Sequence, residues 1–421
     1  MARVLMLTLV FAPDCVSTAN LMTEIASDLQ SLGHELVVIT TEPHSNVDPE
    51  SRSRQPLEPR WGKWVRQSEI NGVRVYHTIM RGKGARVLGR AWDYLLFHAI
   101  SIVAALRLAG RWDIIFAPSP PLSIGVVAWL LGVIRKTPFV YNVQEIHPDA
   151  LVDAGVLTNP VIIWLMRMLE RFVYAGARKI VVISPLFKET LQQKGVPARK
   201  IEVVPNFVDV DDIKPLGKKN PFSVEHSLDD KFVALYAGNI GLSQDMNTLM
   251  DTAEGLRNDS SIVFLVVGDG VEREQMEHGI RKRDLPNILM LPFQPRSTVP
   301  DIYATADVCL VGLRKKMAYT HVPSKIYTIL AAGKPALVGA EPDSEIAAIL
   351  KETGGGLLVP PEDPAALAKA ILQLKNDPTL AAELGRSGRS FIVENYSRGS
   401  VVRQHERILE SAIDQTEAGK S

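Results

Sequence analysis

Residues 232–241 read FVALYAGNIG, and residues 262–270 read IVFLVVGDG. Both are continuous apolar runs that end in a glycine-containing loop, and neither alternates polar with apolar residues as a half-exposed strand does. Continuous apolar runs are typical of parallel strands that helices cover on both faces. The two stretches therefore predict buried strands of a doubly wound α/β domain.

Similar runs occur along most of the chain, with helical patterns between them. The predicted strands are 4–10, 35–40, 114–117, 138–143, 179–183 and 201–204, then 232–237, 262–267, 288–291, 308–311 and 335–338. A polar stretch with three prolines, 205–221, separates the two series and is typical of a linker. We therefore predict two Rossmann-like domains, 1–205 and 222–390, joined by a linker at 206–221. The terminal segment, 391–421, has a long helical pattern with a break near 396–399.

Length and composition agree with two globular domains. The chain has 421 residues, and its 47 basic residues balance its 47 acidic ones, which argues against a nucleic-acid partner. The two cysteines, Cys15 and Cys309, form no metal-binding pattern and suit a reducing cytosol. We interpret the N-terminal apolar run as a first strand rather than a signal peptide. The apolar stretch 114–134 contains prolines, so a strand followed by a helix at 122–132 is favoured over a membrane span.

Ligands of doubly wound sheets bind outside the carboxyl ends of the strands. The loop after 232–237 contains Gly238, Asn239 and Gly241, and the loop after 262–267 contains Gly268 and Asp269. Glycines let a ligand approach the backbone, and the helix that follows offers N–H groups to an anion. The same residues are also compatible with ordinary turns and helix caps.

A charge asymmetry is the strongest feature of the second domain. The stretch 308–340 has no Asp or Glu, but it contains Arg314, Lys325 and further basic residues. It runs from a strand through a loop into a helix predicted at 323–332, where Pro323 and Ser324 suit the first turn. A helix N-terminus with Lys325 beside it is suited to a diphosphate. The alternative is a solvated basic loop that binds nothing.

Two loops of the first domain could also carry function. The loop 12–20 has no GxGxxG pattern, which argues against a dinucleotide cofactor, but its small residues Ser17, Thr18 and Asn20 leave room for an acceptor or a phosphate. The loop 144–149 contains Glu145, His147 and Asp149 after a predicted strand. Such groups can handle the proton of an attacking hydroxyl. Helix capping is the alternative role for this loop.

The segment 60–111 is rich in Arg and Lys and carries Trp61, Trp64 and Trp92. A basic, aromatic segment of this kind can rest on an anionic membrane. An ordinary half-buried helix with a basic rim is the alternative.

Taken together, several segments resemble the family 4 glycosyltransferases of the GT-B fold. They include FAPD (11–14), VQEIHPDALVDAGVL (143–157), YAGNIG (236–241) with Gln244, FLVVGDG (264–270), VPSKIYTILAAGKPALV (322–338) and GGGLLVPPEDPAALAKAI (354–371). The matching segments cover nearly the whole chain in the family's order. The chain looks most like the branch that builds bacterial surface polysaccharides, including O-antigen and colanic acid transferases, and is similar to N-acetylfucosamine transferases.

The resemblance implies two Rossmann-like domains facing a cleft, with the terminal helix crossing back to the first domain. It implies a retaining, metal-independent transfer from a nucleotide diphosphate sugar, with a UDP-sugar favoured, to a lipid-linked saccharide, and no cofactor. The second domain would bind the donor and the first the acceptor. An enzyme of this kind is expected in the cytoplasm, with peripheral contact at the inner face of the cytoplasmic membrane. The residues implied on the donor side are Gly238, Asn239 and Gln244 for the diphosphate, Gly268, Asp269, Pro292 and Phe293 for the nucleoside, and Ser324 and Lys325 for the phosphates.

The sequence departs from the family at two positions. Thr320 and Thr328 stand where the broader family has a pair of Glu residues in the sugar and ribose pocket. These departures leave two alternatives open: a non-catalytic, nucleotide-sugar-binding accessory subunit, and a nucleotide-sugar 2-epimerase on the same fold.

Overall fold

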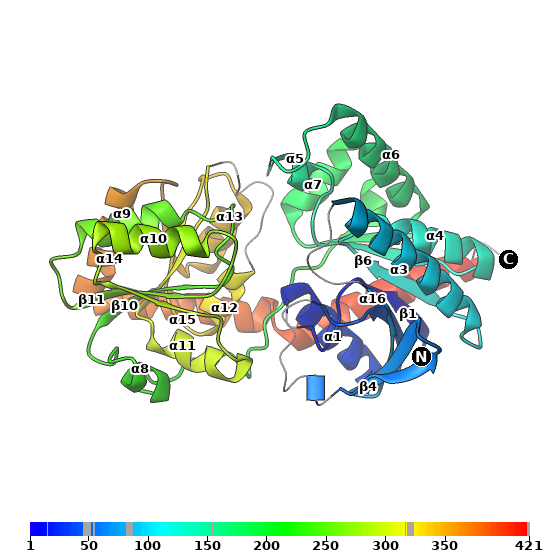
Figure 1. Ribbon diagram of the computed structural model, residues 1–421, viewed down its shortest axis with the longest axis horizontal. Helices are drawn as coiled ribbons and strands as arrows, with labels where there is room; N and C mark the ends of the chain where they lie inside the picture. The colour runs from blue at the N-terminus through cyan, green and yellow to red at the C-terminus, as the bar shows by residue number, and fades with distance from the viewer. Residues whose placement is uncertain are drawn as a thin grey trace. The chain divides into compact units, whose positions relative to one another are not determined.

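The computed structural model describes residues 1–14, 16–44, 52–53, 55–80, 87–153, 155–315, 317 and 324–418. It divides into two compact units, each of which contains one β-sheet. Unit 1 comprises Met1–Asp149, Leu157–Asn206 and Val401–Ser421, and unit 2 comprises Ala150–Val156 and Phe207–Ser400. Figure 1 labels the helices and strands of both.

The sheet of unit 1 has the order β3-β4-β5-β2-β1-β6-β7-β8-β9. Its strands are β1 (Arg3–Leu7), β2 (Glu35–Thr41), β3 (Glu58–Trp61), β4 (Val65–Ile70), β5 (Val73–Thr78), β6 (Ile114–Pro118), β7 (Phe139–Val143), β8 (Lys179–Val182) and β9 (Ile201–Val203). The helices are α1 (Ser17–Ser31), α3 (Val87–Arg107), α4 (Ile124–Arg135), α6 (Pro160–Gly176), α7 (Pro185–Gln193) and α16 (Arg398–Ala418). The short helix α5 (Asp149–Asp153) follows β7 and, except for Asp149, is counted with unit 2. The strand order reverses between β1 and β6, which makes the loops after these strands the switch point of the sheet.

Unit 2 has a parallel sheet of the order β12-β11-β10-β13-β14-β15. Its strands are β10 (Phe232–Ala237), β11 (Ile262–Val267), β12 (Ile288–Leu291), β13 (Val308–Gly312), β14 (Ala336–Gly339) and β15 (Gly356–Val359). Its helices are α8 (Pro221–Glu225), α9 (Met246–Gly255), α10 (Arg273–Arg283), α11 (Val299–Thr305), α12 (Lys325–Ala331), α13 (Glu345–Thr353), α14 (Pro364–Asn376) and α15 (Pro378–Asn395). Here the order reverses between β10 and β13.

Two separate cores confirm that helices cover both faces of the unit 2 sheet. Along β10, Val233 and Leu235 belong to the core that includes α11, α12 and α13, whereas Ala234 and Tyr236 belong to the core that includes α9, α10 and α14. Because successive side chains of a strand point to opposite faces, a strand between two cores must be apolar throughout. This is the physical reason why the continuous apolar runs predicted the fold class correctly.

The prediction of the strands was wrong at the sheet edges. It missed β15 and the edge β3-β4-β5, in which β3 pairs with β4 and β4 with β5 in antiparallel fashion. Only Val65 and Ser68 are buried in β4, and Arg66, Gln67 and Glu69 are polar, so a search for apolar runs passes over this strand. The first strand was also predicted too long, because β1 ends at Leu7. Beyond it, the Thr8 hydroxyl donates to the Val10 carbonyl and turns the chain.

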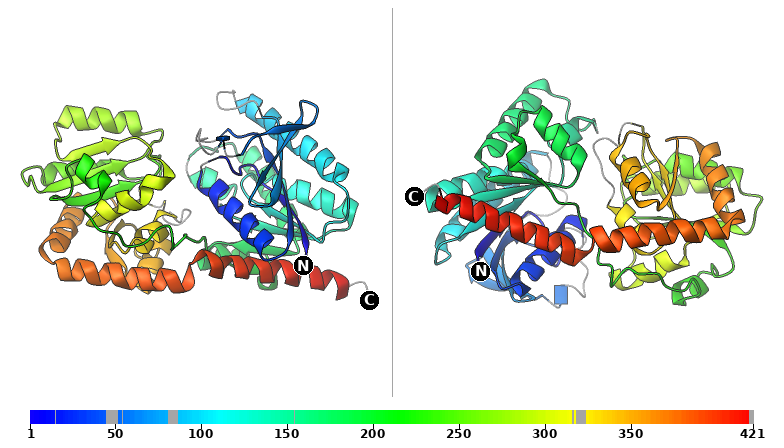
Figure 2. Two further views of the ribbon diagram at one scale, coloured as in Figure 1. Left: turned by 90° about the horizontal axis from the view of Figure 1, so that it is seen from below. Right: turned by 180° about the vertical axis from the view of Figure 1, so that it is seen from behind.

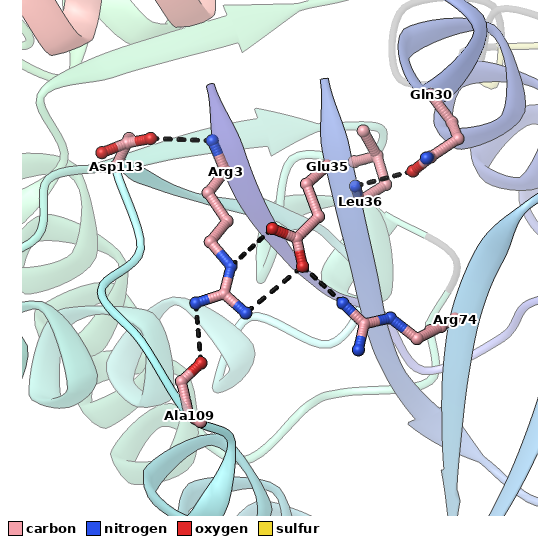
Figure 3. A network of polar contacts seen from close by, with 7 residues as sticks. All are labelled: Arg3, Gln30, Glu35, Leu36, Arg74, Ala109 and Asp113. Carbon is pink, nitrogen blue, oxygen red and sulfur yellow. Dashed lines mark hydrogen bonds and ion pairs between the residues drawn. The ribbon is translucent and has the colours of Figure 1, made fainter. Parts of the chain in front are cut away.

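Polar contacts join the amino ends of the unit 1 strands. The guanidinium of Arg3 on β1 contacts Glu35 on β2, and the same carboxylate pairs with Arg74 on β5 (Figure 3). The backbone N–H of Arg3 donates to Asp113, just before β6, at 2.8 Å. These contacts lie at the edge opposite the loops that could bind a ligand. They therefore position the strands without taking part in a site.

The last helix of the chain belongs to unit 1. The break predicted near 396–399 falls between α15 and α16. Figure 2 shows α16, in red, along the unit 1 sheet. His405 packs edge-on against Phe116 of β6, and His34 Nε2 lies 3.0 Å from the Glu406 carboxylate.

Candidate functional site

The loops that border the switch point of unit 2 contain most of the donor-side residues predicted from the sequence. Gly238 follows β10, Gly268 follows β11, and Arg314 lies just beyond β13. Because β11, β10 and β13 are neighbours in the sheet, their carboxyl ends bring these loops together. The Gly238 N–H donates to the backbone carbonyl of Val267 at 2.9 Å, and the Ile240 N–H donates to the backbone carbonyl of Asp269 at 2.9 Å.

Glycine is required where two of these loops meet. A Cβ placed on Gly268 would lie 1.9 Å from the Gly238 carbonyl oxygen, so only a hydrogen fits there. Gly238 itself has φ +131°, a backbone conformation that residues with a side chain rarely adopt. The sequence prediction that these glycines allow a close approach is compatible with this packing, although the group that approaches Gly268 is protein backbone.

Gln244 links the two cations of the site. Its side-chain oxygen accepts hydrogen bonds from Lys325 Nζ at 3.4 Å and from the Tyr236 hydroxyl at 3.3 Å. Its backbone carbonyl accepts from Arg314 Nε at 3.3 Å. Gln244 is itself buried, so it contacts both cations from the protein interior and not from the solvent side. It therefore positions the basic residues.

Lys325 lies in an unusual environment for an ammonium group. Its Nζ sits 3.9 Å from the centre of the Tyr236 ring, a cation–π contact. Burial of the group lowers the pKa of Lys325 to about 7, while part of the residue stays accessible. In the described part of the chain, no carboxylate lies within ion-pair distance of this nitrogen. The ammonium is thus poorly compensated, and an anionic ligand would stabilise it.

Arg314 differs from Lys325 because an acid compensates its charge. Its Nη2 lies 2.6 Å from the carboxylate of Glu272, which is 9% exposed and precedes α10. The stretch 308–340 contains no acid, but the fold brings one to it from another loop. The guanidinium has five N–H donors, of which these contacts use a minority, so it can still bind a phosphate.

The loops after β11 and β12 contain the residues predicted for the nucleoside side. Pro292 and Phe293 are exposed. The Gly268 N–H donates at 3.2 Å to the carbonyl of Leu291, the residue before Pro292. Arg273 ties the two loops together by donating to the Gly268 and Leu291 carbonyls. Asp269 is exposed and its carboxylate accepts from the Gly270 N–H at 2.8 Å, which is a local turn contact.

The remaining donor-side residues lie on or near α12. Ser324 is exposed and directly precedes α12, without a side-chain cap. Thr328, one turn into the helix, is partly exposed. Thr320 and Pro323 lie outside the described residues. Asn239 is exposed in the loop after β10, and its carbonyl accepts from the Tyr236 hydroxyl at 2.5 Å.

In unit 1, the predicted acceptor loop leads into α1. Ser17 is exposed at the first position of α1, and Thr18 and Asn20 are partly exposed in its first turn. Val16 precedes the helix without a side-chain cap, so the Ser17 and Thr18 hydroxyls lie beside N–H groups of the helix end. These positions are compatible with an acceptor or phosphate contact.

Strand β7 and the loop after it contain two buried polar atoms without a partner. In the described residues, neither His147 Nδ1 nor Asn142 Nδ2 has a hydrogen-bond partner. His147 Nε2 lies 3.6 Å from Glu145, whose side chain is half exposed. Since buried polar groups are normally hydrogen-bonded, an unpaired imidazole nitrogen and an unpaired amide suggest that a polar ligand completes this site. Asn142 was not recognised from the sequence, because it sits inside an apolar strand.

Asp149 lies in an ion-pair cluster. Its carboxylate is 2.7 Å from Lys194 and 3.6 Å from Arg167, and Lys194 also binds the buried Glu170 at 2.7 Å. Burial raises the pKa of Glu170. The structure therefore places Asp149 in contacts that hold α6 and α7, which favours a structural role over proton transfer.

One group of potential metal ligands occurs among the described residues. His34, Glu406 and Glu410 lie close enough to share an ion. However, His34 Nδ1 accepts from the Ala2 N–H at 3.2 Å, so the proton is on Nε2, which faces Glu406. This cluster precedes β2 and lies at the amino edge of the sheet. It is a hydrogen bond between α16 and the sheet rather than part of the candidate site.

Two family models match the chain. Residues 18–206 match the glycosyl transferase 4-like domain, and residues 218–391 match the glycosyl transferases group 1. Among curated proteins, the probable glycosyltransferase WbjE of Pseudomonas aeruginosa is 28% identical over 75% of this chain and 79% of its own length. The putative colanic acid biosynthesis glycosyl transferase WcaI of Escherichia coli K12 is 24% identical over 88% of this chain and 91% of its own.

Solved structures agree with the two-domain architecture. A sucrose-phosphate synthase from Thermosynechococcus elongatus superposes with a TM-score of 0.74 at 16% identity, over 99% of this chain and all of that one. Anabaena Alr3699/HepE in complex with UDP and glucose has a TM-score of 0.73 at 15% identity, over 98% of this chain and 100% of that one. At this level of identity, the likeness bears on the fold.

Proposed function

Because the chain belongs to the family 4 glycosyltransferases of the GT-B fold, we propose that it transfers a sugar from a nucleotide diphosphate sugar to a saccharide acceptor in the synthesis of a bacterial surface polysaccharide. A UDP-sugar is the favoured donor, of a hexosyl or N-acetylhexosaminyl type, and the acceptor is lipid-linked. The relatives WbjE and WcaI support the polysaccharide context, and HepE in complex with UDP supports the base. The enzyme works without a metal at the cytoplasmic face of the membrane.

The observation that carries the proposal is the pairing of Lys325 and Arg314 through Gln244 at the switch point of unit 2. A nucleoside diphosphate brings negative charge that the incompletely compensated Lys325 would stabilise, and Arg314 can add paired hydrogen bonds. These cations would take over the neutralising role of a metal ion as the diphosphate leaves. The exposed Phe293 next to the Gly268 loop offers a surface on which the base can stack.

The transfer retains the anomeric configuration by a same-face route. In this route the leaving diphosphate takes the proton of the incoming hydroxyl, and one bond to the anomeric carbon breaks as the other forms on the same face. The stretch 308–340 contains no carboxylate, and Glu272, which the fold brings to it, is paired with Arg314; neither offers a free nucleophile on the donor side. Glu145 and His147 would orient the acceptor hydroxyl, and the unpaired His147 nitrogen supports this assignment.

A thermal-shift series with UDP, GDP, ADP and dTDP tests donor recognition, since a ligand that binds only the folded protein raises its melting temperature. We expect the largest rise with UDP, unchanged by EDTA. Equal and negligible shifts with all four would contradict nucleotide binding. A requirement for Mn²⁺ or Mg²⁺ would contradict metal independence.

Incubation with the donor then separates the remaining possibilities. A transferase gives product only when an acceptor is present, whereas an epimerase would convert the donor alone. The third possibility, an accessory subunit, remains open because Thr328 replaces an acid of the family. Such a subunit would bind the nucleotide but would neither transfer the sugar to an acceptor nor convert the donor. Intact-protein mass spectrometry should detect no sugar adduct; a stoichiometric adduct on Glu145 or Asp149 would overturn the same-face route.

A further inference from the structure

Helix α6 exposes apolar side chains along its whole outer side. Trp164 is 60% exposed, Leu165 is 53% exposed and Met168 is 48% exposed, and Val161, Ile162 and Phe172 are also exposed. Trp164, Met168 and Phe172 recur every four residues and therefore share one face of the helix. The sides that face the protein are occupied instead by Glu170, Val173 and Tyr174.

An outward face formed by six exposed apolar side chains on one helix is uncommon on a protein surface. Monomeric proteins rarely expose contiguous apolar patches beyond a few hundred Å², and larger ones mark contact sites. The patch is also helical and contains Trp, Phe and Leu, which are the residues that insert into the boundary between lipid headgroups and chains. None of the helices in the described ranges is long and apolar enough to cross a membrane.

The charges around this face identify its partner. Arg167 and Arg171 are exposed on α6; Arg167 also lies 3.6 Å from Asp149, and the only acid of the helix, Glu170, points inward to Lys194. A groove opens where the ends of α4 and α6 meet, and it is lined by Trp129 and Val133 on one side and by Arg178 and Lys200 on the other. Trp129 and Phe172 pack edge to face across the two helices at 4.8 Å.

We propose that the outer face of α6, together with this groove, docks the enzyme onto an anionic lipid bilayer. The apolar side chains would insert among the lipids, while the cations would meet headgroup phosphates. A second copy of the chain fits less well, because a symmetric contact across this face would bring the Arg167 and Arg171 side chains of both copies into one interface. Figure 1 shows α6 at the periphery of unit 1, next to α4. The proposal rests on the proposed function in one respect: membrane docking would give the enzyme access to a lipid-linked acceptor.

This surface differs from the basic segment predicted at 60–111. In the described part of that segment, Trp61 stacks on Tyr76 at 5.4 Å and its residues form β3, β4, β5 and α3. The membrane contact predicted for 60–111 stays a prediction, and α6, with the two cations Arg167 and Arg171, is a separate candidate surface. Helix α6 exposes six large apolar side chains, whereas the described part of α3 exposes three, Leu95, Val103 and Leu106.

Vesicle sedimentation tests the proposal with the full-length protein and no nucleotide. Wild type should sediment with phosphatidylglycerol vesicles, and less with pure phosphatidylcholine or at high salt. The double substitution Trp164→Gln with Leu165→Gln should reduce binding at least about tenfold, since it removes buried apolar area. Arg171→Gln with Arg178→Gln should reduce the preference for anionic vesicles. Val224→Gln and Val271→Gln, which change exposed apolar residues of unit 2, serve as controls and should bind as wild type.

Two outcomes would overturn the docking face: no wild-type binding to anionic vesicles, or undiminished binding by the Trp164/Leu165 variant. Light scattering tests whether a second copy of the chain binds this face instead. If the wild type is a dimer that does not bind vesicles, and the Trp164/Leu165 variant is a monomer, the face is a self-association surface. Calorimetry with UDP keeps the two proposals apart. Vesicle binding by a protein that fails to bind UDP would contradict the donor site and leave the docking face standing.

Discussion

At the scale of single residues, Lys325 has a measurable signature. Its pKa is lowered to about 7 by burial, so at pH 8 most of the unliganded protein carries the neutral amine. A bound diphosphate favours the ammonium and raises this pKa. We therefore predict that UDP binding at pH 8 takes up a proton, and that binding at pH 5.5 takes up none. Calorimetry in two buffers of different ionisation enthalpy measures this uptake.

The matched variant is Lys325→Met, which keeps the length of the side chain. It should bind UDP about 10–100-fold more weakly, as expected for a charged hydrogen bond worth about 1.5–3 kcal/mol, and should show no proton uptake at pH 8. Uptake that persists in this variant would assign the proton to another group. Arg314→Ala should also weaken binding, without changing the uptake.

The loop after β7 gives a second prediction at this scale. Replacing His147 with Ala should lower kcat about 10²-fold, the scale of a positioned acid or base, and leave the melting temperature near that of wild type. Asp149→Asn should behave in the opposite way, because it removes one partner of Lys194 beside the buried Glu170. Glu145→Gln should reduce kcat less than His147→Ala. Steady-state rates and thermal unfolding of all three separate the roles; a stable, inactive Asp149→Asn enzyme would restore Asp149 as a catalytic candidate.

Residue identity could be predicted from the sequence better than residue environment. Lys325 and Arg314 stood out because the stretch around them lacks acids. The sequence could not reveal that Glu272 neutralises one of them and that the Tyr236 ring lies against the other, since Glu272 precedes α10 and Tyr236 is in β10, both distant in sequence. For the same reason, Asp149 looked like a catalytic acid until its contacts with Lys194 and Arg167 were visible.

At the scale of elements, the contact between the loops after β10 and β11 is the most constrained part of the site. We predict that Gly268→Ala lowers the melting temperature and weakens UDP binding, because its Cβ would meet the Gly238 carbonyl at 1.9 Å and the loops must separate. Overpacking of this kind costs about 1–3 kcal/mol. Gly255→Ala is the control, since nothing lies within 4 Å of a Cβ at that position in α9. If both variants bind and melt alike, close packing of the loops is not required.

The edges of both sheets explain why some elements could not be predicted. Central strands such as β10 are apolar on both faces, so their sequence alone identifies them. The edge strand β3 is mostly exposed, and β4 buries only Val65 and Ser68, which makes both strands look like loop or polar sequence. At the opposite edge of the other sheet, β15 is partly exposed too. A search for apolar runs therefore detects strands that are buried on both faces and misses strands that are partly exposed.

At the scale of the whole molecule, the order of the units along the chain differs from a simple succession of domains. The last segment, Val401–Ser421, returns to unit 1 after the chain has completed unit 2. The resemblance to the family implied such a return, but periodicity indicated only a helix with a break. An amphipathic pattern shows that a helix buries one face without identifying the core that receives it.

This return predicts where a defect in α16 will be felt. Leu409 is 2% exposed and lies on α16 with other buried residues, including Val401, Val402 and Ala412. Leu409→Ala should cost about 2–5 kcal/mol, the usual range for a leucine truncated in a core. Because α16 packs on unit 1, we expect hydrogen exchange to accelerate in β1, β2 and β6, which are far away in sequence. The strands β10, β11 and β13 of unit 2 should keep their protection. The affinity for UDP should stay within a factor of about two. Arg407→Ala, at an exposed position of the same helix, controls for the substitution itself. Faster exchange confined to unit 2, or spread equally over both units, would mean that α16 stabilises the molecule through something other than the unit 1 core.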